Sequence, residues 1–270
     1  MHLGFCSFAS SSKGNCFIVK SQTSTILVDI GITAKSLDEN LSRLNVEYEN
    51  INAIVITHEH SDHTKSLHTI VRKRPWKGIV YATAGTKQKV MEKTSALLDE
   101  DFNVIHSGDN FFVGDIKVSV FRLSHDGIEP VGYSFECEGK KITIVTDTGN
   151  VTDEIFQSIR GSDILVIEAN HEKNILLYGR YTYALKCRIL SDIGHLSNEA
   201  CGNCICSYLE DIRGVKTPTV ILAHLSQENN TPQQAFLTVK NILEEQEFFP
   251  GKDLVLEVAQ KDSPGKFIEV

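Results

Sequence analysis

The run Thr57-His58-Glu59-His60-Ser61-Asp62-His63 constrains this chain more than any other segment. Three imidazoles and the Asp62 carboxylate fall within six residues, directly after an apolar strand predicted over residues 53–57. Polar rings and a carboxylate at the edge of a β-core are costly unless they have hydrogen-bond or metal partners. The alternative is a solvated loop that happens to be rich in histidine. We interpret the run as a strand-end loop of metal ligands.

The spacing within this run predicts how the ligands are shared. On an extended backbone His58 and His60 project to the same side, so both can reach one ion. Asp62 and His63 follow after the chain has turned and can reach another. The run therefore indicates two neighbouring ions.

The remaining pattern favours an α/β fold with a single domain over residues 1–270, because no repeat or linker-like stretch interrupts it. A hairpin around residues 21–24 differs from the strict strand–helix alternation of a doubly wound parallel sheet, so we expect two mixed sheets packed face to face with helices outside. Strands are predicted over 17–20, 25–29, 53–57, 78–82, 116–121, 142–146 and 164–167, and helices over 33–44, 84–98, 198–210 and 232–245.

Composition narrows the class of protein but not the substrate. The net charge of −8 argues against a surface coated in positive charge for indiscriminate nucleic-acid binding, although a local basic groove stays open, with residues 72–77 and 186–188 as weak candidates. We find no apolar run of the ~20 residues that span a bilayer, so we expect a soluble, cytoplasmic protein without a membrane partner. The seven cysteines, an odd and scattered set, indicate reduced thiols.

The histidine run matches the H-x-H-x-D-H signature of the metallo-β-lactamase superfamily, and the chain resembles that superfamily along its whole length. The other expected blocks occur in order after apolar runs: Asp29-Ile30-Gly31, Ser124-His125-Asp126, Thr146-Asp147-Thr148-Gly149 and Ala223-His224-Leu225-Ser226. The resemblance implies a four-layer αββα sandwich.

It also implies a binuclear centre of zinc, manganese or iron, in which a hydroxide shared by two divalent ions attacks the substrate. By resemblance, His58, His60 and His125 hold one ion, Asp62, His63 and His224 hold the other, and Asp147 bridges the two. Asp29 would orient the first loop.

The segment from Gly194 to Ala200 bears on the substrate. It opens a helical pattern with Ser197 or Asn198 as N-cap, and free amides at a helix start favour phosphate. His195 could donate a proton to the leaving oxygen, which would make it catalytic together with Asp62 and Asp147. An ordinary capped helix with an exposed histidine is the alternative.

This Gly-His-Leu-Ser block resembles phosphodiesterase members of the superfamily, such as the tRNA 3′-processing nucleases, and the chain is more similar to the bacterial WalJ/YycJ group. The similarity extends to the opening from Ser10 to Cys16, to Glu168-Ala169-Asn170-His171 and to Asn229-Asn230. It implies a 5′-to-3′ DNA exonuclease linked to mismatch repair, with DNA and repair proteins as partners. Candidate phosphate-binding residues are Ser12, Asn15, Asn170, His195, Ser197 and Asn229, and His171 is a candidate for orienting the site.

Three alternatives stay open. The same fold could hydrolyse a small thioester, lactone or cyclic nucleotide. It could process RNA, although the chain lacks the long Gly/Pro-rich arm of the tRNA-processing group. It could also be a non-catalytic metal-binding module.

Overall fold

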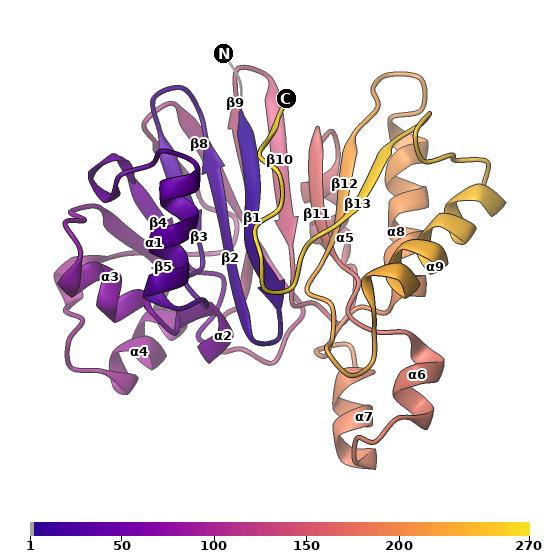
Figure 1. The fold of residues 1–270 in the computed structure, drawn as a ribbon, viewed down its shortest axis with the longest axis horizontal. Helices are drawn as coiled ribbons and strands as arrows, with labels where there is room; N and C mark the ends of the chain where they lie inside the picture. Colours follow the sequence, from indigo (N-terminus) through magenta and orange to yellow (C-terminus); the bar gives the residue numbers. More distant parts are fainter. Residues whose placement is uncertain (1–2) are drawn as a thin grey trace.

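The structure is a computed structural model that describes residues 3–270 (Figure 1). Within them, two seven-stranded sheets pack face to face, and helices cover the outer face of each sheet. Both sheets contain parallel and antiparallel neighbours. The predicted α/β class and αββα sandwich with two mixed sheets are confirmed.

The first sheet holds the amino-terminal strands and, at one edge, the last strand of the chain. Its strands are β1 (Gly4–Ser11), β2 (Gly14–Lys20), β3 (Thr25–Val28), β4 (Ala53–Val55), β5 (Ile79–Thr83), β6 (Phe102–Ile105) and β14 (Ile268–Glu269). They lie in the order β14-β1-β2-β3-β4-β5-β6, with β3 to β6 parallel and the other neighbours antiparallel.

The second sheet is built from the following half of the chain. Its strands are β7 (Asn110–Val113), β8 (Ile116–Arg122), β9 (Val131–Cys137), β10 (Lys140–Val145), β11 (Ile164–Glu168), β12 (Thr219–Ala223) and β13 (Val255–Val258). They lie in the order β13-β12-β11-β10-β9-β8-β7, and β10 to β13 are parallel.

Helices flank the first sheet on one side of the molecule and the second sheet on the other (Figure 1). The first group is α1 (Ala34–Arg43), α2 (Ser61–Thr64), α3 (Leu67–Lys73) and α4 (Ala84–Lys93). The second group is α5 (Asp153–Ile159), α8 (Asn198–Asp211) and α9 (Pro232–Glu245), while α6 (Lys173–Tyr178) and α7 (Tyr183–Ile189) project from one end. Two 3-10 turns lie at Tyr48–Asn50 and Asp99–Asp101.

The core has three layers of buried apolar side chains, because each sheet buries both of its faces. Between the sheets, Phe17 and Val28 of the first sheet belong to the same cluster as Tyr133 and Val166 of the second. The outer layers bury α1, α3 and α4 against the first sheet and α5, α8 and α9 against the second. The strands are thus held rigidly, and their ends offer fixed positions for functional groups.

The fold corrects the length predicted for one helix and agrees with the expected state of the cysteines. The helix predicted over 84–98 is shorter, since α4 ends at Lys93 where Thr94 is extended (φ −158°, ψ 129°), and Leu97 then turns into the core. All seven cysteines lie in the described part of the chain and are free thiols, as expected. No helix formed by residues 3–270 combines the length and the apolar character needed to cross a membrane.

Candidate metal centre

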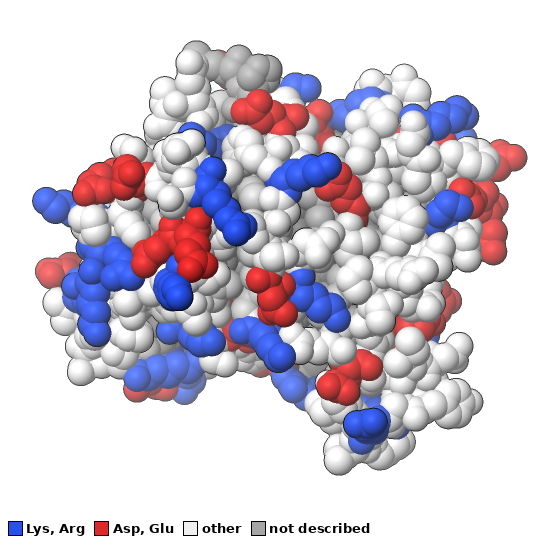
Figure 2. Space-filling view, viewed as in Figure 1, with Lys and Arg blue, Asp and Glu red and all other residues white. Residues whose placement is uncertain are grey.

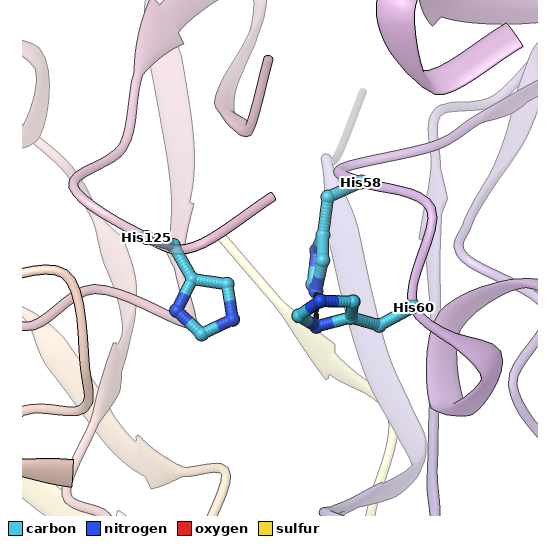
Figure 3. A group of neighbouring side chains, drawn as sticks. All are labelled: His58, His60 and His125. Atoms are coloured by element: carbon cyan, nitrogen blue, oxygen red, sulfur yellow. Dashed lines mark hydrogen bonds between the residues drawn. The ribbon is translucent and has the colours of Figure 1, made fainter. Parts of the chain in front are cut away.

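The ligand run lies between β4 and α2, at the carboxyl end of a buried strand. His58 Nε2 and His60 Nδ1 are 3.0 Å apart. Figure 3 shows His125 reaching toward this pair from a different loop, the one that follows β8. Donor atoms of the three residues lie within 4.8 Å of one another, so one ion could bind all three.

A second group forms beside the first. Donor atoms of Asp62, His63 and His224 also lie within 4.8 Å of one another. His63 is in α2 and His224 follows β12, so the group draws on both sheets. The structure therefore brings together the two sets of three that the sequence predicted.

Asp147 contacts histidines of both groups. Its Oδ1 lies 3.7 Å from His125 Nε2 and 3.4 Å from His224 Nε2, and its Oδ2 lies 3.2 Å from His63 Nε2. A carboxylate in contact with both groups could be shared by two ions, were both groups to hold one. The placement suits the bridging role expected for Asp147.

Several buried polar atoms converge here without hydrogen bonds. Among residues 3–270, His125 Nε2, His224 Nε2 and Asp147 Oδ2 are buried and make none. Buried polar atoms are nearly always hydrogen-bonded or bound to a metal. Imidazole nitrogens and carboxylate oxygens are also the donor set that zinc, manganese and iron accept. The residues fit divalent ions.

For three of the proposed ligand histidines, the protein holds the ring nitrogen that faces away from the centre. His63 Nδ1 lies 2.7 Å from Asp29 Oδ2, His125 Nδ1 lies 3.0 Å from the Gly194 carbonyl, and His224 Nδ1 lies 2.8 Å from Glu168 Oε1. Such partners fix the tautomer and leave Nε2 free to bind a metal. Asp29 thus lies where the sequence placed it, directly behind a ligand.

Three residues of the centre adopt a left-handed backbone. Asp29, Asp147 and His224 have φ values of 60°, 62° and 52°, and each follows the carboxyl end of a strand. A non-glycine residue in this region is uncommon and costs of order 1 kcal/mol or more. Here the turn keeps each side chain at the sheet edge, where it faces the centre.

The buried carboxylates of the centre stabilise positive charge on the groups beside them. For His63, burial lowers the pKa, but Asp147 and Asp29 outweigh burial and hold it well above its usual value. For Asp147, burial raises the pKa, but His224 and His63 hold it well below its usual value. Metal-binding histidines must be neutral, so divalent ions would replace this protonic charge and release protons on binding.

Comparison with known proteins identifies the family. Residues 24–225 match the family model described as beta-lactamase superfamily domain. The chain belongs to the beta-lactamase superfamily.

Within this superfamily, exodeoxyribonuclease YycJ of Bacillus anthracis is 35% identical over 267 residues, which cover 98% of each chain. Exodeoxyribonuclease WalJ of Streptococcus pneumoniae serotype 2 (strain D39) is 36% identical over 265 residues, covering 97% of this chain and 96% of the relative. Zn²⁺-bound PqqB from Methylobacterium extorquens superposes with a TM-score of 0.71 at 14% identity, covering 99% of this chain and all of that one. The resemblance to the WalJ/YycJ group is confirmed, and the chain is a metal-dependent hydrolase.

Glu168 is a residue of this superfamily site that sequence analysis missed. It ends β11, is fully buried, and places Oε1 2.8 Å from both His195 Nδ1 and His224 Nδ1. Burial raises its pKa, but the two histidines outweigh burial and lower it to about 2. The available signal was an acidic residue at the end of an apolar run, the same signal that marked Asp29.

Asp126 is a second such residue. Its Oδ1 lies 3.3 Å from His125 Nε2 and 3.6 Å from His60 Nε2, and its Oδ2 accepts a 2.6 Å hydrogen bond from Arg188 Nε. Asp126 therefore lies beside two of the proposed ligands, where its carboxylate adds negative charge that would favour a bound cation. It belongs to the quoted Ser124-His125-Asp126 block, but sequence gave no reason to separate it from its neighbours.

The predicted substrate residues divide into two kinds. His195 keeps 19% of its side chain exposed, and Ser12 is exposed in the turn between β1 and β2. The others are buried, and their side chains bond within the protein: Asn15 contacts Asp62 and His63, Asn170 donates to the His224 carbonyl, Ser197 caps α8, and Asn229 donates to Ser226.

The start of α8 differs from the expected phosphate site. Ser197 is the N-cap and its Oγ accepts the amide of Ala200 at 3.2 Å, while the amide of Asn198 donates to the His171 carbonyl at 2.9 Å. Two amides are thereby used internally. His171 itself is 1% exposed, and neither of its ring nitrogens has a hydrogen-bond partner among residues 3–270.

Asp29→Asn is expected to weaken metal binding by about 10- to 100-fold with the fold retained. Asparagine tolerates the left-handed backbone. Because the Thr57 amide keeps the asparagine oxygen in the place of Oδ1, the NH2 group replaces Oδ2 and cannot accept the His63 Nδ1 proton. The measurement is metal content after titration with a chelator. Asp38→Asn, which changes only contacts with Arg74 and Tyr48 away from the centre, is the matched control, and equal metal retention by the two variants would rule out this role.

Proposed function

We propose that this protein is a binuclear metal-dependent phosphodiesterase that degrades DNA from 5′ to 3′. The observation that carries the proposal is the arrangement of two three-residue ligand groups around Asp147, with His195 partly exposed beside them. The names of the relatives at 35% and 36% identity, both exodeoxyribonucleases, favour DNA as the substrate.

Two divalent ions, when bound, would lower the pKa of attacking water and neutralise charge on the phosphate. The chain's own residues do the rest. Asp147 contacts histidines of both ligand groups and so fixes their separation, and Asp62 completes the second group. Glu168 accepts the Nδ1 proton of His195, which orients the ring so that Nε2 can give a proton to the leaving oxygen.

The proposed ligands come from strand ends of both sheets. Because Asp147 follows β10 of the second sheet and contacts His63 in α2, which follows β4 of the first sheet, we infer that residues 1–270 work as a single domain. Zinc, manganese and iron all suit the donor set.

The similarity to the WalJ/YycJ group is the basis for proposing mismatch repair as the setting and repair proteins as partners.

A cavity beside His125 favours the second candidate, hydrolysis of a small thioester, lactone or cyclic nucleotide. Its volume is about 520 Å³, and Ile128, Pro130 and Ile193 contribute apolar walls. A cavity of this size and character could enclose a small substrate. The same cavity could accept the terminal nucleoside of DNA, so the two functions must be separated by experiment.

We expect metal-stripped protein to degrade linear duplex DNA only after manganese, zinc or iron(II) is restored. With a 5′-labelled strand, label should be released as small products before the strand shortens, whereas a 3′ label should stay on the shortening strand. Bis(p-nitrophenyl) phosphate serves as the small control substrate. Turnover of that diester without loss of DNA would favour the second candidate, and early release of the 3′ label would reverse the polarity.

A further inference from the structure

A hollow lies between α2, α3 and α4, next to the metal-binding run. Its volume is about 390 Å³. Ser61, which sits between the ligands His60 and Asp62, forms part of its wall. The side chains lining it within the described chain include no acidic residue, and they are Ser61, Thr64, Lys65, Leu67, His68, Val90, Lys93, Thr94 and Leu97.

The surroundings of this hollow are basic in an acidic protein. Residues 61–93 contain eight lysines and arginines and two acidic residues, whereas the whole chain has a net charge of −8. Figure 2 shows lysine and arginine side chains along the lower edge of the molecule, over α2 and α4. Association with a polyanion is favoured where positive charge is locally concentrated.

Two cations that line the hollow have no acidic partner. Lys65 makes no ion pair with any residue of 3–270, and Lys93 donates only to the Glu59 carbonyl. In the basic run over residues 72–77, Arg72 and Arg74 are neutralised by Asp101 and Asp38, while the exposed Lys73 and Lys77 make no ion pair within residues 3–270. Positive charge is therefore available to a ligand in the hollow, with more of it nearby at Lys73 and Lys77.

We infer that this hollow binds a backbone phosphate next to the one that is cut, an inference that rests on the proposed function. Lys65 and Lys93 supply charge, and the hydroxyl of Ser61 can donate a hydrogen bond to a phosphate oxygen. A divalent cation would find no carboxylate here.

The subsite explains how an acidic protein could prefer a polymer. A small diester has only the reacting phosphate and cannot reach the metal centre and the hollow together. A polynucleotide can occupy both, so binding energy gained in the hollow adds to affinity for DNA and not to affinity for the small diester. Selectivity for DNA should therefore depend on Lys65.

Lys65→Glu is expected to raise KM on DNA about tenfold and to lower the slope of log KM against log salt by about one, as the loss of one phosphate contact requires. The rise should be at least about fivefold greater on DNA than on bis(p-nitrophenyl) phosphate. Lys65→Arg should stay within about threefold of wild type because it keeps the charge. Lys252→Glu, the same charge change at a site 76% exposed near the far end of α8, is the matched control.

The outcomes separate the subsite from the proposed function. If Lys65→Glu and Lys252→Glu affect DNA equally, the subsite is wrong even where wild type degrades DNA. If wild type does not degrade DNA, the proposed function fails, and binding of a fluorescent oligonucleotide decides about the hollow. Weaker binding by Lys65→Glu than by Lys252→Glu would then support the subsite, and equal binding would reject it.

Discussion

Asp147→Ala is expected to lower kcat on any phosphodiester by about 10³-fold or more. Asp147 contacts His125, His63 and His224, so its removal leaves the two ligand groups without a shared carboxylate. We expect the variant to hold about one ion in place of two. The reaction then loses the second positive charge near the phosphate, and the remaining ligands are no longer held at a fixed separation.

The test for Asp147 needs a variant that folds without strain. Alanine disfavours the left-handed backbone at φ 62°, so Asp147→Asn, which tolerates that backbone, should be measured beside it. Metal content and kcat are determined for both, with Asp211→Ala, a change of an exposed carboxylate at the far end of α8, as control. Full activity in Asp147→Ala, with two ions retained, would contradict the binuclear mechanism.

His195→Ala is expected to lower kcat on DNA by about 10²- to 10⁴-fold while leaving metal content nearly unchanged. His195 is held by Glu168 through Nδ1 and belongs to neither of the two proposed three-residue ligand groups, although it lies near Asp147 and His224. Its loss should therefore remove proton donation rather than the ions. Loss of metal from this variant would show instead that His195 is itself a ligand.

The identity of the leaving group gives a sharper readout. A nitrophenolate leaves without needing a proton, but the sugar oxygen of DNA needs one, so His195→Ala should be much less damaging on bis(p-nitrophenyl) phosphate than on DNA. A merely structural role for His195 would slow both substrates alike. His106→Ala, which changes a surface histidine 71% exposed, is the control.

The fold could be predicted, and the seven proposed ligands could be named, because both rest on local patterns. Apolar runs such as residues 25–28 and 53–55 gave the strands, and each proposed ligand follows such a run. The resemblance to a known superfamily then joined blocks as distant as His58 and His224. The predicted carboxyl end of the helix over 84–98 was wrong, because apolar residues continue at helical spacing past Thr94, where the helix has already ended.

The substrate residues were harder to predict because a sequence does not show which groups a polar side chain uses as hydrogen-bond partners. Asn15 and Asn170 looked available for phosphate, yet both are buried and bonded to the metal-binding residues or their backbone. Glu168 and Asp126 gave no distinctive motif, although their carboxylates lie against ligand histidines. Lys65 differs from Lys87 and Lys89 in having no acidic partner, and that difference depends on tertiary contacts.

The left-handed residues at the strand ends bear on how function could be lost in evolution. Glycine would relieve the backbone at positions 29, 147 and 224 and stabilise the fold, but it would remove an orienting carboxylate, the shared carboxylate or a ligand imidazole. Selection for activity and selection for stability are therefore opposed at these positions. In descendants that no longer bind metal, glycine or asparagine should accumulate there first, so these positions distinguish enzymes from inactive copies of the same fold.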